Sequence, residues 1–237
     1  MLSHMSLVHS PPASSPASSA SLSSRQESLE TLTLGDWLKL EPFSLCLSSG
    51  FFGFFAHAGV ISILEEEGLT PKRLYGSSAG ALVSGLWASG VSATTLREAL
   101  VDLDRADFWD PGLGMGLLKG SLFDQRLEEL LGCERFEETR YPLSVTAFNI
   151  YKCRGVVFNQ GPLAPAIRAS CTFPGLFQPK WIRNAPYLDG GITDRSGTLG
   201  ISNGERVFYH HLASRSRWRN ALGLTHIPDR SHQVALC

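Results

Sequence analysis

Short apolar runs alternate along this chain with longer apolar segments that end in charged residues or glycine. Residues 43–47 and 73–76 predict two buried strands, because each run is brief, mostly apolar and followed by serine and glycine. Residues 55–68 and 78–90 predict helices, since they are longer and each stops at a glycine. Further strands are expected at 143–150, 154–159, 180–189 and 206–212, and further helices at 93–104, 122–132 and 162–170. Ser121 and Asp124 have the spacing that starts a helix, so they predict the beginning of the segment at 122–132.

The interleaving of strands and helices indicates an α/β protein in which helices flank a sheet. The first 24 residues contain ten serines and no Asp, Glu, Lys or Arg, a composition that cannot build a core. We therefore expect a disordered Ser/Pro-rich tail over residues 1–40, one globular domain over 41–214 and an irregular extension over 215–237. An organelle transit peptide is the alternative for the tail, although its first basic residue is Arg25.

Composition excludes several classes of function. The chain has 21 basic and 22 acidic side chains and a net charge of −1, so we expect no nucleic-acid partner. Five cysteines at irregular spacings argue against a disulfide framework and a structural zinc site, and favour a reducing, intracellular compartment. Residues 43–64 lack charge and are long enough to cross a bilayer, but their glycines and serines favour a strand, a turn and a helix instead.

The sequence GSSAG fits the nucleophile-elbow pattern G-x-S-x-G, with Gly76, Ser78 and Gly80 in its fixed positions. A strand is predicted before it and a helix after it, which is the context in which such a turn lifts a serine hydroxyl out of a sheet. Ser78 is therefore the candidate nucleophile, and Ser77 is expected only to keep the turn small. The alternative interpretation is a glycine-lined turn that packs against the first helix.

A nucleophilic serine needs a base and donors for an oxyanion. The donors are expected upstream, where Gly50 and Gly53 lie between the first strand and the first helix. Asp189 stands at a predicted strand end before two glycines and could accept the serine proton directly, although D-G-G is also common in hairpin turns. Ser78, Asp189 and either His210 or His211 also follow the chain order of an α/β-hydrolase triad. In that fold, however, several strands precede the nucleophile, and only one strand–helix unit does so here.

These motifs occur in an order that resembles the patatin-like phospholipase family. The family has a glycine-rich oxyanion loop, a G-x-S-x-G nucleophile and a late D-G-G or D-G-A aspartate; this chain reads SSGFFG at 48–53, GSSAG at 76–80 and DGG at 189–191. The stretch IRASCTFPGLFQP is also similar to the family's A-S-x-x-x-P segment. The resemblance implies a three-layer α/β/α fold with a central, mostly parallel sheet.

The resemblance also implies a Ser-Asp dyad without histidine, in which Ser78 is the nucleophile and Asp189 the general base. Backbone amides of the turn would form the oxyanion hole, and glycines beside the dyad would support it; these residues are Gly50, Phe51, Phe52 and Gly53, and Gly76, Gly80, Gly190 and Gly191 respectively. The implied reaction is hydrolysis of a lipid ester through an acyl-enzyme, without a metal or an organic cofactor. The implied partner is a lipid at a membrane or lipid-droplet surface. The expected location is intracellular, either cytoplasmic or peripheral to a membrane.

The chain departs from the family pattern in the oxyanion turn. Ser48 and Ser49 replace the first two glycines, and Phe52 stands where many members carry arginine. The alternative function is accordingly a catalytically impaired member that binds lipid or a membrane surface. A second hypothesis concerns the apolar, glycine-rich segment 108–120, which we expect to flank the site as an acyl-chain channel or a mobile lid.

Overall fold

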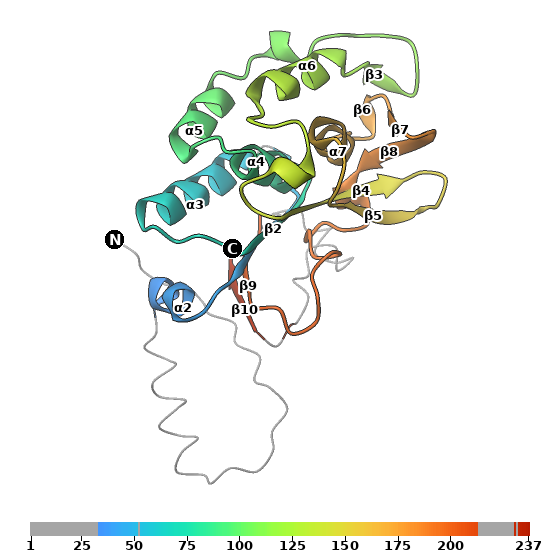
Figure 1. Ribbon diagram of the computed structural model, residues 1–237. Helices are drawn as coiled ribbons and strands as arrows, with labels where there is room; N and C mark the ends of the chain where they lie inside the picture. The colour runs from blue at the N-terminus through green and yellow to red at the C-terminus, as the bar shows by residue number, and fades with distance from the viewer. Residues whose placement is uncertain (1–32, 52, 213–229, 231) are drawn as a thin grey trace, which may run out of the picture.

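The computed structural model describes residues 33–51, 53–212, 230 and 232–237 (Figure 1). Within these residues, eight strands form one sheet in the order β10-β9-β1-β2-β4-β8-β7, with β5 paired to β4. The strands are β1 (Ser44–Leu47), β2 (Arg73–Ser77), β4 (Leu143–Asn149), β5 (Arg154–Phe158), β7 (Lys180–Ile182), β8 (Ala185–Asp189), β9 (Val207–His210) and β10 (Gln233–Leu236). The pairs β10-β9, β9-β1, β1-β2 and β2-β4 are parallel, whereas β5, β7 and β8 join in antiparallel pairs. The predicted α/β class and mostly parallel sheet are confirmed.

The helices are α2 (Leu34–Leu40), α3 (Phe54–Glu66), α4 (Ala79–Ala88), α5 (Ala93–Val101), α6 (Ser121–Leu130) and α7 (Leu163–Ser170). Short 3₁₀ turns lie at η1 (Arg105–Asp107), η2 (Phe136–Glu138) and η3 (Gly190–Ile192). Figure 1 shows α4 between α3 and α7, next to β2 and β4. Every residue of α4 is buried, which agrees with its nearly uniform apolar sequence.

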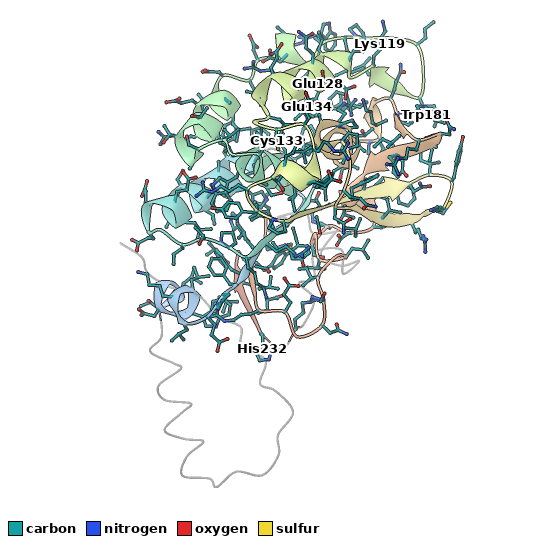
Figure 2. The ribbon with its side chains drawn as sticks, in the orientation of Figure 1. Lys119, Glu128, Cys133, Glu134, Trp181 and His232 are labelled. Atoms are coloured by element: carbon teal, nitrogen blue, oxygen red, sulfur yellow. The ribbon has the colours of Figure 1, made fainter. Side chains whose placement is uncertain are left out.

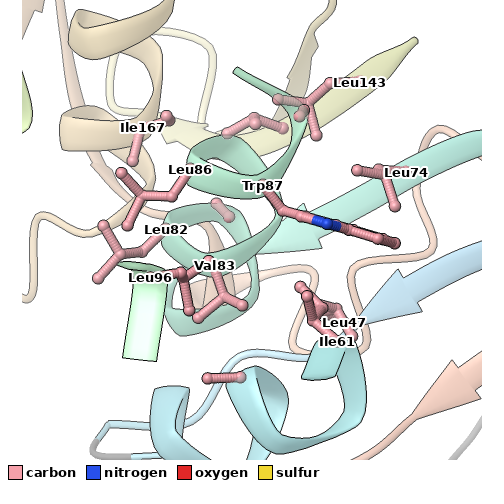
Figure 3. Packing of buried hydrophobic residues seen from close by; sticks show 14 of the residues in the cluster. Leu47, Ile61, Leu74, Leu82, Val83, Leu86, Trp87, Leu96, Leu143 and Ile167 are labelled. Carbon is pink, nitrogen blue, oxygen red and sulfur yellow. The ribbon is translucent and has the colours of Figure 1, made fainter. Parts of the chain in front are cut away.

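The core forms where α4 meets the central strands and α3. Leu47 from β1, Ile61 from α3 and Trp87 from α4 belong to one cluster of buried side chains (Figure 3). The Trp87 indole N–H donates to a carboxylate oxygen of Glu65 at 2.7 Å, so the large ring is buried without leaving its polar atom unpaired. This packing fixes α3 and α4 on the sheet, and the turns that precede both helices carry the candidate site.

Three expectations about element boundaries need correction. Residues 34–40, expected to be disordered, form α2, which begins with a reciprocal capping box between Thr33 and Asp36. Residues 233–236, expected to be irregular, form β10 and extend the sheet beside β9. Ser121 does not cap α6; Gly120 is the N-cap residue, and the Asp110 carboxylate accepts the N–H groups of Gly120 and Ser121. The predicted tail over 1–32 and most of the predicted extension lie outside the described residues.

The stretch at 43–64 folds as β1, a turn and α3, as the glycines and serines in it predict. In the part of the chain that the structure describes, no helix combines the length and apolar character needed to cross a bilayer.

The segment at 108–120 contains a short strand, β3 (Gly116–Leu118), which pairs in parallel with β6 (Gly175–Phe177). This two-stranded sheet ties the segment to the chain just before β7. The sequence pattern does not predict β3, because the strand has only three residues and lies in a glycine-rich segment.

Parallel pairing brings the carboxyl ends of several strands to one edge of the sheet. Leu47 at the end of β1 lies opposite Gly76 in β2 and His210 in β9, and Ser77 lies opposite Thr146 in β4. The turns that follow β1, β2 and β9 therefore converge. Asp189 joins them from the antiparallel strand β8, where it pairs with Ala147.

Candidate active site

Ser78 occupies a sharp turn between β2 and α4. Its backbone angles are φ 53° and ψ −117°, a strained conformation for a residue with a side chain. A β-carbon on Gly76 would collide with the Gly80 backbone, and one on Gly80 would collide with the Leu47 carbonyl. The two fixed glycines of the pattern are thus required by close backbone packing, and Ser78 has the geometry of a nucleophile elbow.

A chain of hydrogen bonds from β4 and α7 holds this elbow in place. The Ser78 N–H donates to the Ser170 hydroxyl at 2.8 Å, and that hydroxyl donates to the Thr146 carbonyl at 2.6 Å. The Cys171 thiol donates to the Ser78 carbonyl at 3.2 Å. Ser170 and Cys171 lie in the A-S-x-x-x-P segment, so the family resemblance was the one signal in the sequence that pointed to them.

Asp189 lies within hydrogen-bonding distance of the candidate nucleophile. The Ser78 hydroxyl donates to its Oδ2 at 2.7 Å, and the Gly191 N–H donates to its Oδ1 at 2.8 Å. Burial raises the pKa of the Asp189 carboxyl to about 6, and the hydrogen bonds from Ser78 and Gly191 oppose that rise. At neutral pH, Asp189 is therefore an ionised acceptor for the Ser78 proton.

The glycines that follow Asp189 are required by contacts of this site. A β-carbon on Gly190 would collide with the Thr146 carbonyl, and one on Gly191 would collide with the Ser49 side chain. The DGG sequence therefore turns the chain directly beneath the elbow instead of forming an open hairpin loop.

The proposed oxyanion residues lie in the turn between β1 and α3, but they differ in availability. The Gly53 N–H donates to the Gly50 carbonyl at 2.9 Å, so Gly53 is committed to the turn itself. Phe51 lines the same cavity as Ser78. Phe52 lies outside the described residues. Among the described residues, no hydrogen bond uses the Gly50 N–H, which leaves Gly50 as the strongest candidate donor.

Ser48, which replaces a family glycine, connects this turn to the end of β9. Its N–H donates to the His210 carbonyl at 3.2 Å, and its hydroxyl accepts the Leu212 N–H at 2.8 Å. Leu212 in turn packs where a β-carbon on Gly50 or Gly53 would lie. The departure from glycine therefore has a structural role in fixing the turn.

His57 and His210 support the turn between β1 and α3. They do not form a triad with Ser78 and Asp189. His57 Nε2 lies 2.8 Å from the Ser48 carbonyl and must donate to it, so His57 Nδ1 accepts from His210 Nδ1, also at 2.8 Å. His211 pairs with the Tyr209 hydroxyl. His210 and His211 are both buried. Among the described residues, no histidine is hydrogen-bonded to Ser78 or Asp189, which disfavours an α/β-hydrolase triad.

An apolar cavity of about 520 Å³ opens onto the dyad. Ser78 and Asp189 line it, and aromatic side chains supply much of the remaining wall, among them Phe51, Phe54, Phe108, Trp109, Phe173 and Phe177. Phe108 and Trp109 thus flank the site as expected, whereas Leu113 does not line the cavity and is fully exposed. Such a lining suits an acyl chain. No cluster of three or more metal-binding side chains occurs within the described residues.

Comparisons with known proteins identify the family of this chain. The sequence profile of the family described as "Patatin-like phospholipase" matches residues 45–199, more than half of the chain. An uncharacterized NTE family protein of Mycobacterium bovis is 30% identical over 163 residues, which are 64% of this chain and 43% of that protein. The protein named lysophospholipase NTE1 of Lodderomyces elongisporus is 26% identical over 187 residues, 72% of this chain and 13% of that protein. This chain therefore spans less than half the length of these two relatives.

A structural neighbour confirms the architecture. The crystal structure of VipD from Legionella pneumophila aligns with a TM-score of 0.60 at 16% identity, covering 77% of this chain and 52% of that chain. Identity at this level bears on the fold alone, and the expected three-layer α/β/α fold is confirmed.

Proposed function

The chain belongs to the patatin-like phospholipase family, and from that premise we propose that it hydrolyses carboxylic esters of lipids through a Ser78–Asp189 dyad. The observation that carries the proposal is the 2.7 Å hydrogen bond from the Ser78 hydroxyl to the Asp189 carboxylate beside an apolar cavity. The strained elbow supports it, because it presents this hydroxyl at the end of a strand instead of burying it.

In the proposed reaction, Asp189 accepts the Ser78 proton while Ser78 Oγ attacks the ester carbonyl carbon. The oxyanion is stabilised by the Gly50 N–H and by the positive end of the α4 dipole, since α4 begins at Ala79. Asp189 then passes the proton to the leaving alcohol, which leaves an acyl-enzyme on Ser78. Water attacks this ester with Asp189 as base, and the fatty acid is released.

The same cavity supports a lipid with an acyl chain as the substrate class. Its apolar lining favours hydrocarbon, and we propose that the protein meets its substrate at a membrane or lipid-droplet surface as a peripheral protein. The second candidate is a member that binds lipid without cleaving it. Two observations favour it: the Gly53 N–H is committed within the turn, and Ser48 and Ser49 replace two family glycines.

Fluorophosphonate labelling tests the dyad. We expect the purified chain to be labelled, Ser78→Ala to lose all labelling, and Asp189→Asn to lose at least a hundredfold in labelling rate because no base remains. Ser77→Ala is the matched control, since Ser77 is adjacent and buried and its hydroxyl has no hydrogen-bond partner among the described residues. A folded wild type that resists labelling would favour the lipid-binding alternative, and labelling kept in Ser78→Ala would exclude the proposed nucleophile.

A further inference from the structure

A long stretch of this chain carries only positive charge. Between Glu138 and Asp189 there is no Asp or Glu, although the whole chain is nearly neutral. The stretch contains six cations: Arg140, Lys152, Arg154, Arg168, Lys180 and Arg183. Such asymmetry concentrates charge on whichever face these residues share.

Three of these cations lie exposed on two neighbouring hairpins. Lys152 lies in the turn between β4 and β5, Arg154 is the first residue of β5, and Arg183 lies in the turn between β7 and β8. None of the three forms an ion pair with a described residue. In contrast, Arg168 is buried and Lys180 pairs with Asp124 at 2.7 Å.

Two exposed aromatic residues stand beside these cations. Tyr151 is 66% exposed and Trp181 is 60% exposed, and their rings meet edge to face with centroids 6.1 Å apart. The contact brings the two hairpins together. Exposed Tyr and Trp next to Lys and Arg are typical of protein surfaces that sit among lipid headgroups.

The segment with β3 adds apolar side chains to the same end of the molecule. Leu113, Met115 and Leu117 are 103%, 75% and 50% exposed, and an exposed lysine, Lys119, follows them. The Gln178 side chain donates to the Leu113 carbonyl at 2.9 Å, just before β7 begins. In Figures 1 and 2, this segment, β7 with Trp181, and the β4–β5 turn occupy one end of the molecule, away from α2 and α3.

This end of the molecule is continuous with the candidate active site. Trp109 and Leu118, on either side of the exposed leucines and methionine, line the cavity that contains Ser78. Phe173, just before β6, and Phe177, the last residue of β6, line it as well. A surface that covered the exposed apolar residues would therefore lie beside the entrance for an acyl chain.

We propose that Leu113, Met115, Leu117, Tyr151 and Trp181, with Lys152, Arg154 and Arg183, form a docking surface for a phospholipid bilayer that contains anionic lipid. The apolar side chains enter the interface, and the cations face the negative headgroups. Each cation should strengthen partitioning onto the bilayer by roughly fivefold. The cations lie beside apolar tips, not along a groove, which fits a lipid surface better than a nucleic acid. The inference rests on the proposed function only in taking a lipid as substrate.

Vesicle sedimentation tests the docking surface independently of catalysis when every variant carries Ser78→Ala. We expect the parent to bind phosphatidylcholine vesicles weakly and to bind vesicles containing phosphatidylserine at least tenfold more tightly. Lys152→Glu with Arg154→Glu should abolish the preference for phosphatidylserine. Leu113→Gln with Met115→Gln should reduce binding to both kinds of vesicle by several-fold.

Matched controls lie far from this surface. Lys72→Glu removes an exposed cation before β2, and Ile63→Gln removes a 60% exposed apolar side chain from α3. The proposal is overturned if patch and control variants bind alike, if phosphatidylserine has no effect, or if the patch retains an oligonucleotide but not vesicles. Vesicle binding by a chain whose Ser78 resists labelling would refute the hydrolase and leave the docking surface standing.

Discussion

At the scale of single residues, Asp189 determines how the proposed activity should depend on pH. A base must be ionised to accept the Ser78 proton, and burial raises the pKa of Asp189 to about 6. We expect kcat/KM for a soluble ester to rise about tenfold per pH unit below pH 6 and to level off above pH 7. The measurement is a pH profile of the wild type in a buffer series of constant ionic strength.

A profile that stays flat down to pH 4.5 would show that Asp189 keeps an ordinary carboxyl pKa or is not the base. Residual Asp189→Asn activity provides the comparison, because it should lack this ionisation.

The sequence alone predicts the two residues of the dyad, but it does not predict the residues that hold them in position. Ser78 and Asp189 lie in short motifs with glycines whose positions are set by close backbone contacts. Ser170 lies 92 residues from Ser78, and only the fold brings its hydroxyl to the elbow amide. The histidine pair under the oxyanion turn spans 153 residues and was missed for the same reason.

At the scale of elements, two glycines in neighbouring helices should respond in opposite ways to the same change. In α4, a β-carbon on Gly80 would strike the Leu47 backbone, which cannot move without displacing β1. In α3, a β-carbon on Gly59 would meet nothing within 4 Å. We expect Gly59→Ala to stabilise the protein by about 0.5–1 kcal/mol, because alanine costs less backbone entropy in a helix.

Gly80→Ala should instead destabilise the protein by roughly 3 kcal/mol or more, because the added methyl group meets rigid backbone that cannot shift to make room for it. Denaturant unfolding of both variants measures the two free energies. Equal effects, or a stable Gly80→Ala protein with an unchanged labelling rate, would contradict the tight elbow.

The elements that sequence patterns predicted are those with a clear apolar pattern bounded by serine or glycine. β1, β2, α3 and α4 match their expected segments within a few residues, because β1, β2 and α4 are buried almost throughout and α3 buries one face that includes Ile61 and Leu64. The short elements were missed, since β3 and β10 have three and four residues and gain their stability from partners distant in sequence. The capping box of α2 was present at Thr33 and Asp36, but the serine-rich composition before it favoured disorder.

At the scale of the whole molecule, buried titratable groups should set the stability of the fold in acid. Burial lowers the pKa of His57 to about 3 and that of His210 to about 4, from the ordinary 6.5. The unfolded chain therefore binds one more proton at each histidine between about pH 4.5 and pH 6. Asp189 acts in the opposite direction, because its pKa is raised and the folded state holds the extra proton there.

The net difference at these three groups is one proton, so their contribution to the free energy of unfolding should fall by about 1.4 kcal/mol for each pH unit lost in this window. Asp189→Asn removes the opposing proton. The contribution of these groups should then steepen to about 2.7 kcal/mol per pH unit, because His57 and His210 are the two that remain of the three. Both slopes follow from urea unfolding at several pH values between 4.5 and 7. A variant slope equal to or shallower than that of the wild type would mean that Asp189 is not held protonated by burial in the folded protein, and the same result would remove the basis for the predicted activity profile.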